Sequence, residues 1–218
     1  MPTQMNKDVS CPSCGAAVKT QMYPGIDAQK NPELRNVVLD ETLFDWKCPA
    51  CGYEAQLVYP CLYHDSELKY MVYVVPNGND RTLGAVSVEQ KFPQLAGLKK
   101  RVVVSLAELK EKVLIFESGL NDFAAELTKL AMLDVANQKH GAVVDSCYFC
   151  SLDEAAGRMT FSFFLHGQQE PAVQSTRMEV YRKSLEIVES VGCSEEEFQA
   201  VDAETARKIL REYRGEDE

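Results

Sequence analysis

The sequence predicts an α+β protein: a small antiparallel sheet with an inserted helix comes first, and a helical hairpin, a β-hairpin and C-terminal helices follow. Three observations carry this prediction. The string Cys-Pro-x-Cys-Gly occurs at residues 11–15 and again at 48–52, short strand-like segments flank both copies, and sustained helical periodicity starts only after Ser105. We therefore expect a first unit at 1–92 and an α+β unit at 93–218, which can pack on the first.

The repeated string is typical of a metal-binding turn, here called a knuckle. Two cysteines two positions apart on a tight turn place both sulfurs on one side of it. Proline after the first cysteine fixes φ, and glycine after the second permits a positive φ. Two facing knuckles supply four thiolates, which is the tetrahedral set of a structural zinc ion. The predicted ligands are Cys11, Cys14, Cys48 and Cys51.

A pair of redox dithiols is the alternative for these cysteines, but two matched knuckles favour zinc over a single dithiol motif. The first unit is then zinc-ribbon-like. Four thiolates leave no coordination position for water or substrate. The strongest motif of the chain therefore predicts a structural Zn²⁺ and designates no catalytic residue.

Composition limits the function classes. The chain has 218 residues, 8 cysteines and a formal net charge of −10. Residues 1–91 hold 8 basic and 11 acidic residues (net −3), and residues 92–218 hold 15 and 22 (net −7). Two acidic halves argue against nucleic acid as the partner. The start of the chain carries no secretory segment, and no apolar run reaches the ~18–20 residues of a membrane helix. We expect a cytoplasmic protein without membrane contact.

The elements of the first unit follow from strand alternation and breakers. A helix is expected to begin at Pro32, with Asn31 as its N-cap. Pro24-Gly25 is expected to end the strand before it. The predicted strands cover 16–23, 43–47, 53–59 and 68–75, with a turn at 76–78.

The second unit is predicted from capping boxes and periodicity. Ser105-x-x-Glu108 opens a helix that ends near Gly119, and a second helix runs from Asn121 or Asp122 to Gly141. Further boxes at Thr176-x-x-Glu179 and Ser194-x-x-Glu197 each predict a helix start. The remaining elements are strands at 102–104, 143–152 and 159–166 and a charged last helix at 203–214.

With these features the chain resembles the CpXC family, prokaryotic proteins named for such paired knuckles. The stretches that carry the resemblance are both knuckles, Pro32-Glu33-Leu34-Arg35, Tyr59-Pro60 with Leu62-Tyr63-His64-Asp65, and residues 109–122, which read LKEKVLIFESGLND. They cover roughly the first 130 residues. The resemblance implies a zinc-ribbon-like domain with an inserted helix, and it implies no activity.

The stretch Tyr63-His64-Asp65 is the most interesting one outside the knuckles. His64 can serve as an acid–base group or contact a ligand. The competing interpretation is a turn between two strands, in which Asp65 satisfies backbone donors. We favour the turn, because three adjacent polar residues do not define a site without a partner elsewhere. Cys61, just before them, is interpreted as a small buried residue rather than a spare ligand.

Two further clusters are weighed in the same way. Cys147 and Cys150 repeat the two-residue spacing, but without Pro and Gly and in a strand-like run, where positions three apart point to opposite faces. We expect no metal or redox site there. Lys99-Lys100-Arg101 is the only tight basic cluster; it can touch phosphate, but we interpret it as a solvated strand entrance.

Together these features favour a non-enzymatic, zinc-dependent adaptor whose partner is another protein. A nucleic-acid-associated regulator is the alternative, because zinc ribbons often serve that role, although the charge opposes it. An enzyme that uses the Tyr63–Asp65 region is the third possibility, and it requires His64 to line a concave pocket.

Overall fold

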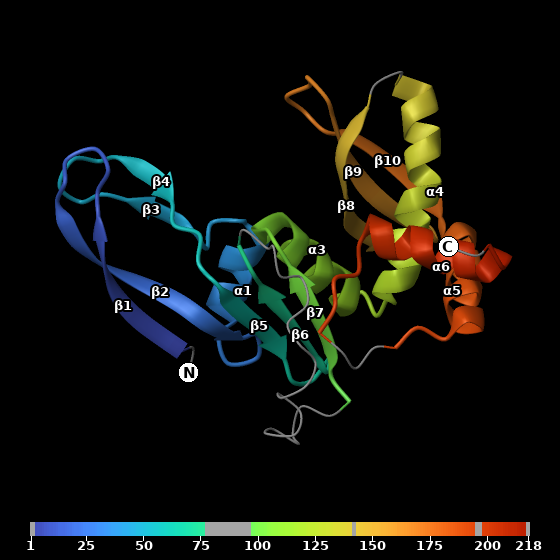
Figure 1. The fold of residues 1–218 in the computed structure, drawn as a ribbon, viewed down its shortest axis with the longest axis horizontal. Coiled ribbons are helices and arrows are strands. Elements are labelled where there is room, and N and C mark those ends of the chain that lie inside the picture. The colour runs from blue at the N-terminus through green and yellow to red at the C-terminus, as the bar shows by residue number, and fades with distance from the viewer. Residues whose placement is uncertain (1–2, 77–96, 141–142, 195–197, 217–218) are drawn as a thin grey trace. The chain divides into compact units, whose positions relative to one another are not determined.

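The computed structural model describes residues 3–76, 97–140, 143–194 and 198–216, which form five helices and three sheets (Figure 1). This confirms the α+β class. The chain divides into two compact units, Met1–Lys110 with Glu196–Gln199 and Glu111–Glu195 with Ala200–Glu218. The predicted boundary at 92/93 and the turn at 77–78 lie outside the described residues. None of the described helices is long and apolar enough to cross a membrane.

The first unit contains a five-stranded sheet in the order β1-β2-β5-β6-β7. Pairs β1–β2 and β5–β6 are antiparallel, whereas β2–β5 and β6–β7 are parallel, so this sheet is mixed. Its strands are β1 (Thr3–Ser10), β2 (Ala17–Asp27), β5 (Cys61–Asp65), β6 (Tyr70–Val74) and β7 (Lys99–Val103).

A second hairpin and one helix complete this unit. Strands β3 (Asp45–Lys47) and β4 (Glu54–Gln56) pair antiparallel, and α1 (Pro32–Leu39) is the inserted helix. The helix begins at Pro32 as predicted, but Asn31 makes no side-chain capping bond. The prediction that Pro24-Gly25 ends a strand is wrong, because β2 continues to Asp27 where it gains β5 as a parallel neighbour.

The core of this unit lies where the mixed sheet is widest. Ile26, Tyr63 and Val72, on three adjacent strands, are fully buried. The outer part of the sheet differs: most side chains of residues 4–10 in β1 and of residues 17–21 at the start of β2 are exposed. The hairpin that carries the first knuckle therefore has little apolar packing of its own, and two-stranded hairpins are marginal without it.

The second unit follows the prediction more closely. It contains most of α3 (Leu106–Glu117), whose start carries the predicted box: Ser105 Oγ accepts the Glu108 N–H at 3.1 Å, and Glu108 Oε2 accepts the Val104 N–H at 2.9 Å. The other elements are α4 (Asp122–His140), β8 (Val144–Asp153), β9 (Arg158–Leu165), β10 (Ala172–Arg177), α5 (Met178–Val191) and α6 (Ala203–Arg214).

Two predictions in this unit need correction. Thr176 does not cap a helix, because it pairs with Met159 in β10, the third strand of a β10-β9-β8 sheet; α5 starts after Arg177, which makes no side-chain cap. The expected β-hairpin is thus part of a three-stranded sheet. The Ser194-x-x-Glu197 box lies partly outside the described residues.

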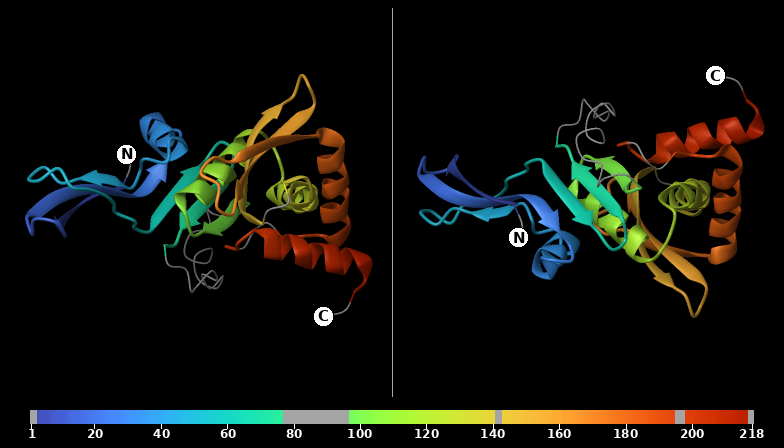
Figure 2. Two further views of the ribbon diagram at one scale, coloured as in Figure 1. Left: turned by 90° about the horizontal axis from the view of Figure 1, so that it is seen from above. Right: turned by 90° about the horizontal axis from the view of Figure 1, so that it is seen from below.

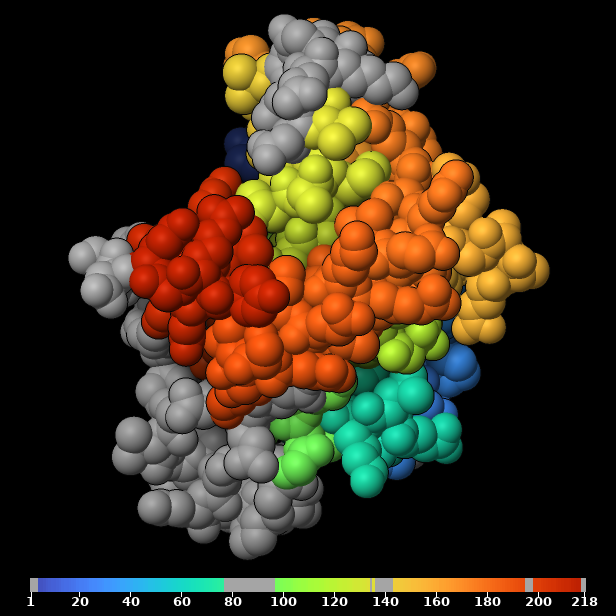
Figure 3. Space-filling view, turned by 90° about the vertical axis from the view of Figure 1, so that its right-hand side faces the viewer, coloured from blue at the N-terminus to red at the C-terminus, as the bar shows by residue number. Residues whose placement is uncertain are grey.

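Helix α4 is the centre of the second unit. It packs against β8, α5 and α6, as the end-on view in Figure 2 shows, and in Figure 3 its surface is seen between α5 and α6. Strand β9 alternates, with one face fully buried against this core, and α4 contributes small and apolar residues to it. The buried side chains of β9 are Met159, Phe161, Phe163 and Leu165.

Candidate metal centre

The two knuckles are the turns of the two hairpins, and they have the same backbone geometry. In the first, Gly15 donates its N–H to the Cys11 carbonyl at 2.9 Å, and in the second Gly52 donates to Cys48 at 2.8 Å. Both glycines have positive φ, 71° and 76°. That conformation is strained for a residue with a Cβ, so the glycines are required by the turn. The sequence repeat is therefore a structural repeat.

The knuckle tips lie side by side and bring their sulfurs together (Figure 1). All four Sγ atoms lie within 4.8 Å of one another. Cys11 Sγ is 3.6 Å from Cys51 Sγ, and Cys14 Sγ is 3.8 Å from Cys48 Sγ. A tetrahedral ion with Zn–S bonds of about 2.3 Å requires S···S edges of about 3.8 Å. The geometry fits a four-coordinate metal ion.

Each knuckle contributes one inner and one outer sulfur. Cys11 and Cys48 are buried at 2% and 1% exposure, whereas Cys14 and Cys51 are exposed. Burial opposes ionisation of Cys11, but N–H groups of Cys14 and Ser13 and the neighbouring thiols lower its pKa to about 7. The Ala16 N–H favours the Cys14 thiolate, yet Cys51, burial and the other thiols raise the pKa of Cys14 to about 12. Without a metal the cluster resists holding four thiolates, which a divalent ion makes favourable.

A side-chain hydrogen bond joins the two hairpins beside the sulfur cluster. Trp46 Nε1 donates to Thr20 Oγ1 at 3.0 Å, linking β3 to β2. Across β3–β4, Lys47 Nζ lies 2.7 Å from Glu54 Oε1, but both side chains are largely exposed, so the pair contributes little. A metal ion bound by the four sulfurs would add a further link between the two hairpins.

The Tyr63–Asp65 stretch lies within β5 and not in a turn, so the turn interpretation is wrong; the turn follows at residues 66–69. Successive side chains of a strand point to opposite faces, so Tyr63 and Asp65 are buried on one face of β5 and His64 is half-buried on the other. Asp65 does satisfy backbone donors: its Oδ1 accepts N–H bonds from Glu67 and Leu68, each at 2.9 Å. Cys61 is fully buried, as expected, and burial raises its pKa to about 12.

Asp27 is the partner of His64 that the sequence did not reveal. The two residues are register neighbours on the parallel strands β2 and β5, and His64 Nε2 lies 3.9 Å from Asp27 Oδ2. Lys30 Nζ is closer, at 2.6 Å, and Asp27 Oδ1 accepts the N–H groups of Gln29 and Lys30 at 3.2 Å. Burial opposes ionisation of Asp27, but Lys30 and His64 lower its pKa. The parallel pairing of β2 with β5 has no local sequence signal, so the sequence alone does not reveal that Asp27 lies beside His64.

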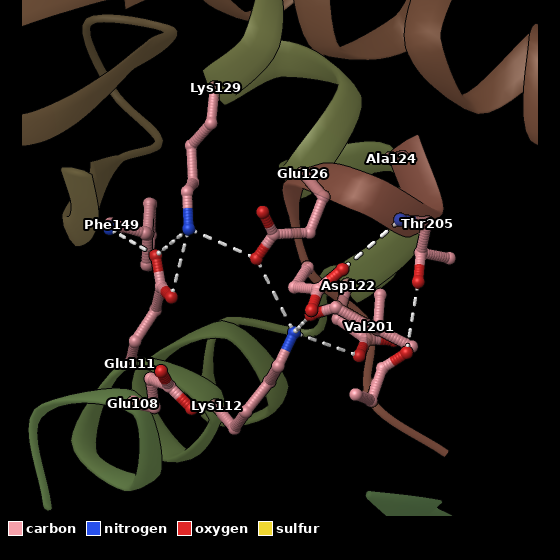
Figure 4. A network of polar contacts seen from close by, with 12 residues as sticks. Glu108, Glu111, Lys112, Asp122, Ala124, Glu126, Lys129, Phe149, Val201 and Thr205 are labelled. Carbon is pink, nitrogen blue, oxygen red and sulfur yellow. Dashed lines mark hydrogen bonds and ion pairs between the residues drawn. The ribbon is translucent and has the colours of Figure 1, made fainter. Parts of the chain in front are cut away.

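A second polar cluster lies in the second unit, and we call it the α3–α4 charge network: Glu111, Lys112, Asp122, Glu126 and Lys129 (Figure 4). Lys129 Nζ lies 2.9 Å from Glu111 Oε1 and 3.0 Å from Glu126 Oε1. Lys112 Nζ lies 3.2 Å from Asp122 Oδ2 and 3.5 Å from Glu126 Oε1. All five residues are buried.

The network also holds backbone groups of two other segments. Phe149 of β8 donates its N–H to Glu111 Oε1 at 2.6 Å, and Lys112 Nζ donates to the Val201 carbonyl at 2.8 Å (Figure 4). Three carboxylates face two ammonium groups. Burial raises the pKa of Glu126, although Lys129 and Lys112 act in the opposite direction. Sequence reasoning did not predict this cluster, because acids and lysines at helical spacing are typical of a helix face that contacts solvent.

The remaining clusters lie as follows. Cys147 and Cys150 both lie in β8 as predicted, Cys147 buried and Cys150 Sγ 2.9 Å from Ser162 Oγ. The interpretation of Lys99-Lys100-Arg101 as a solvated entrance is wrong. Lys100 and Arg101 are 1% and 0% exposed, because they lie within β7 between β6 and residue 199. These two cations are not available to a phosphate backbone.

Comparison with known proteins places these features in one family. A family model described as CpXC protein matches residues 9–129, more than half of the chain. The matched segment contains both knuckles, Tyr63–Asp65 and all five residues of the α3–α4 charge network. Neither the curated proteins nor the solved structures contain a match to the chain.

Proposed function

The chain belongs to the CpXC family, and we propose that it is a zinc-dependent, non-enzymatic adaptor that binds another protein in the cytoplasm. The closed cluster of four cysteine sulfurs is the observation that carries the proposal. A tetrahedral set of four thiolates is typical of structural zinc and leaves no position for a substrate. None of the eight cysteines, all of which lie in the described part of the chain, forms a disulfide, which suits a reducing compartment.

The metal part of the proposal is tested by metal analysis of the purified protein. We expect one zinc ion per chain for the wild type, loss of that ion in Cys48→Ser, and full retention in the control Cys193→Ser. Iron in place of zinc would contradict the identity of the metal, because an iron ion can occupy a four-thiolate site as well. Full zinc content in Cys48→Ser would contradict the ligand set.

A protein partner is supported by the surface of the knuckles. Their tips present Pro12, Ser13, Pro49 and Ala50, all exposed, and Tyr53 follows the second knuckle with 41% of its surface exposed. Backbone held by a metal loses little freedom on binding, which favours affinity. An exposed tyrosine on such a rigid support is the residue type that dominates protein interfaces.

Nucleic acid is disfavoured by charge. The chain carries −10, and non-specific binding depends on Lys and Arg that neutralise phosphates. The burial of Lys100 and Arg101 removes two cations of the one tight basic cluster. We expect no appreciable binding to random DNA or RNA near physiological salt by fluorescence anisotropy. Micromolar, salt-sensitive binding would favour the regulator over the adaptor.

An enzyme at Tyr63–Asp65 is disfavoured by the bonds that its carboxylates already make. Asp65 accepts two backbone N–H groups and Gln29 Nε2, and Asp27 accepts two backbone N–H groups and Lys30 Nζ. Carboxylates occupied by such donors stabilise loops and are poor general bases. His64 is thus supported as a structural partner of Asp27.

The adaptor role is tested by isolating the tagged protein from its own cells and quantifying the partners. Tyr53→Ala should retain zinc and lose the partner, whereas Tyr213→Ala, a matched exposed tyrosine on α6, should retain both. The interaction is then rebuilt from purified components and titrated. Undiminished partner binding by both Tyr53→Ala and zinc-free Cys48→Ser would show that the knuckles are not the contact.

A further inference from the structure

Each knuckle exposes one of its two cysteines to solvent. Cys14 and Cys51, the second cysteine of each knuckle, are exposed, whereas Cys11 and Cys48 are buried. The thiolate is both the form of cysteine that binds metal and the form that reacts with oxidants, and oxidation also requires access from solvent. A small oxidant in water can therefore reach the metal centre directly at two of its ligands.

The sulfur contacts connect each exposed cysteine to a buried cysteine of the other knuckle. Cys51 Sγ lies 3.6 Å from Cys11 Sγ, and Cys14 Sγ lies 3.8 Å from Cys48 Sγ. The S–S bond of a disulfide is about 2.05 Å long, so the two sulfurs of each pair need to approach by about 1.6–1.8 Å. One sulfur of each pair is open to attack and the other lies next to it, which is the arrangement that lets oxidation end in a disulfide.

Exposure distinguishes the knuckles from the other four cysteines. Two of those four are buried and two are half-buried (Cys61 and Cys147; Cys150 and Cys193). All eight cysteines lie in described segments, so the two exposed knuckle cysteines are the ones that solvent reaches most directly. An oxidant should therefore react at the metal centre before it reacts elsewhere on the chain.

We propose that the metal centre is also a peroxide-sensitive modification site. Peroxide oxidises Cys14 and Cys51, each forms a disulfide with its neighbour in the other knuckle, Cys48 and Cys11 respectively, and the metal ion is released. The proposal rests on the proposed zinc site, because a bound ion keeps all four sulfurs deprotonated. It goes beyond the adaptor role, because it makes the zinc content depend on oxidant. In reducing compartments such disulfides are transient and serve redox sensing.

The chemistry needs one peroxide for each disulfide. The Cys14 thiolate attacks one oxygen of hydrogen peroxide, so that an S–O bond forms, the O–O bond breaks, and the hydroxide that leaves takes up a proton to become water. The Cys48 thiolate then attacks this sulfenic sulfur, the S–S bond forms, and a second hydroxide leaves and is protonated. The two sulfurs lose two electrons, and the peroxide is reduced to two waters. Cys51 and Cys11 react in the same way with a second peroxide.

The full-length, zinc-loaded chain is treated with increasing amounts of hydrogen peroxide. Zinc release is followed with a chromogenic chelator, the remaining thiols are counted, and disulfides are mapped by tandem mass spectrometry of a digest that is not reduced. We expect release of one zinc ion per chain, loss of four thiols, and linked peptides that join Cys14 to Cys48 and Cys11 to Cys51. Dithiothreitol followed by zinc should restore both the thiols and the bound ion.

The control is Cys193→Ser, which removes a half-buried thiol outside the centre and should release zinc at the same peroxide dose as the wild type. Retention of zinc and of the four knuckle thiols in a molar excess of peroxide would overturn the proposal and leave the zinc site standing. Disulfides formed within a single knuckle, or zinc loss that reduction does not reverse, would overturn it too. A purified chain without zinc would contradict the proposed function as well as this proposal, so the two failures are distinguishable.

Discussion

The knuckles and the α3–α4 charge network hold their surroundings together in opposite ways. In the first unit, four sulfurs from two turns converge on a position for an external ion, and the strands beside them bury little. In the second unit, five charged side chains from two helices neutralise one another inside an apolar core. We therefore expect order in the first to depend on a bound metal ion, and order in the second to depend on intact ion pairs.

Metal removal should produce the largest difference between the two regions. Structural zinc contributes about 10–16 kcal/mol of apparent binding free energy in small finger domains, and that energy is coupled to folding. Strong chelation should abolish amide hydrogen-exchange protection around residues 11–60. Protection in α3 and α4, around residues 106–138, should largely remain, because those helices are packed in their own core.

The control for this experiment is the same measurement after zinc is restored, which should return the protection at 11–60. Uniform loss of protection over both regions would show a single cooperative unit. It would also contradict the independence that the two compact units suggest.

The knuckles were predictable, because every constraint on them is local. Cysteine spacing, proline and glycine are all contained in five residues, and the repeat shows that the two turns serve one site. The same locality explains why the elements of the second unit were mostly predicted: α3, α4, β8, β9 and α6 each carry their own periodicity or cap. The failures at β10 and at the end of β2 arise where a neighbouring strand decides the conformation.

Breaking the charge network should give the next largest effect. Lys129→Met leaves Glu111 and Glu126 buried without their shared cation, and removal of one partner of a buried pair costs about 3–5 kcal/mol. Urea unfolding measures the loss. The matched control Lys183→Met, on the exposed face of α5, should change the free energy of unfolding by less than about 0.5 kcal/mol. Zinc content should not change in either variant.

Equal destabilisation by the two lysine variants would show that the network contributes nothing beyond general packing.

The network could not be predicted, because its members are charged and occupy helical positions that are typical of solvent contact. Their burial follows from tertiary packing around α4. For the same reason Lys100 and Arg101 were assigned to the surface: a run of cations in the sequence contains no information about the strands beside it.

The raised pKa of Glu126 predicts a smaller, pH-dependent effect. The ordinary pKa of a glutamate is near 4.5, and at pH values above it the folded state still retains the carboxyl proton of Glu126 while the unfolded state loses it. The stability of the fold therefore falls as the pH rises from 4.5 toward the raised pKa of the folded state. Glu126→Gln keeps an acceptor for Lys129 and removes this penalty. We expect Glu126→Gln to be more stable than the wild type at pH 8 and the difference to be smaller at pH 5.

Denaturant unfolding at both pH values measures this difference, and Glu186→Gln on the exposed face of α5 is the control, for which we expect no pH-dependent change. A Glu126→Gln protein that loses more stability at pH 8 than at pH 5 would show that the network favours the ionised carboxylate. The excess negative charge would then be balanced by other groups.

The smallest effect is expected at the other pair of cysteines with knuckle spacing. Cys147 is buried and burial raises its pKa, whereas Cys150 Sγ lies beside Ser162 Oγ, at the point between Phe149 and Ser151 where the register of β8 shifts. Changing both to Ala should leave zinc at one ion per chain and cost about 1 kcal/mol from the small cavity at Cys147. The matched control, Cys11→Ala with Cys14→Ala, has the same spacing and should lose the ion entirely.

A fall of one ion per chain in the Cys147 and Cys150 double variant would show that spacing alone suffices to bind metal. The contrast between knuckle and strand would then be wrong, because strand geometry would not keep the two sulfurs apart.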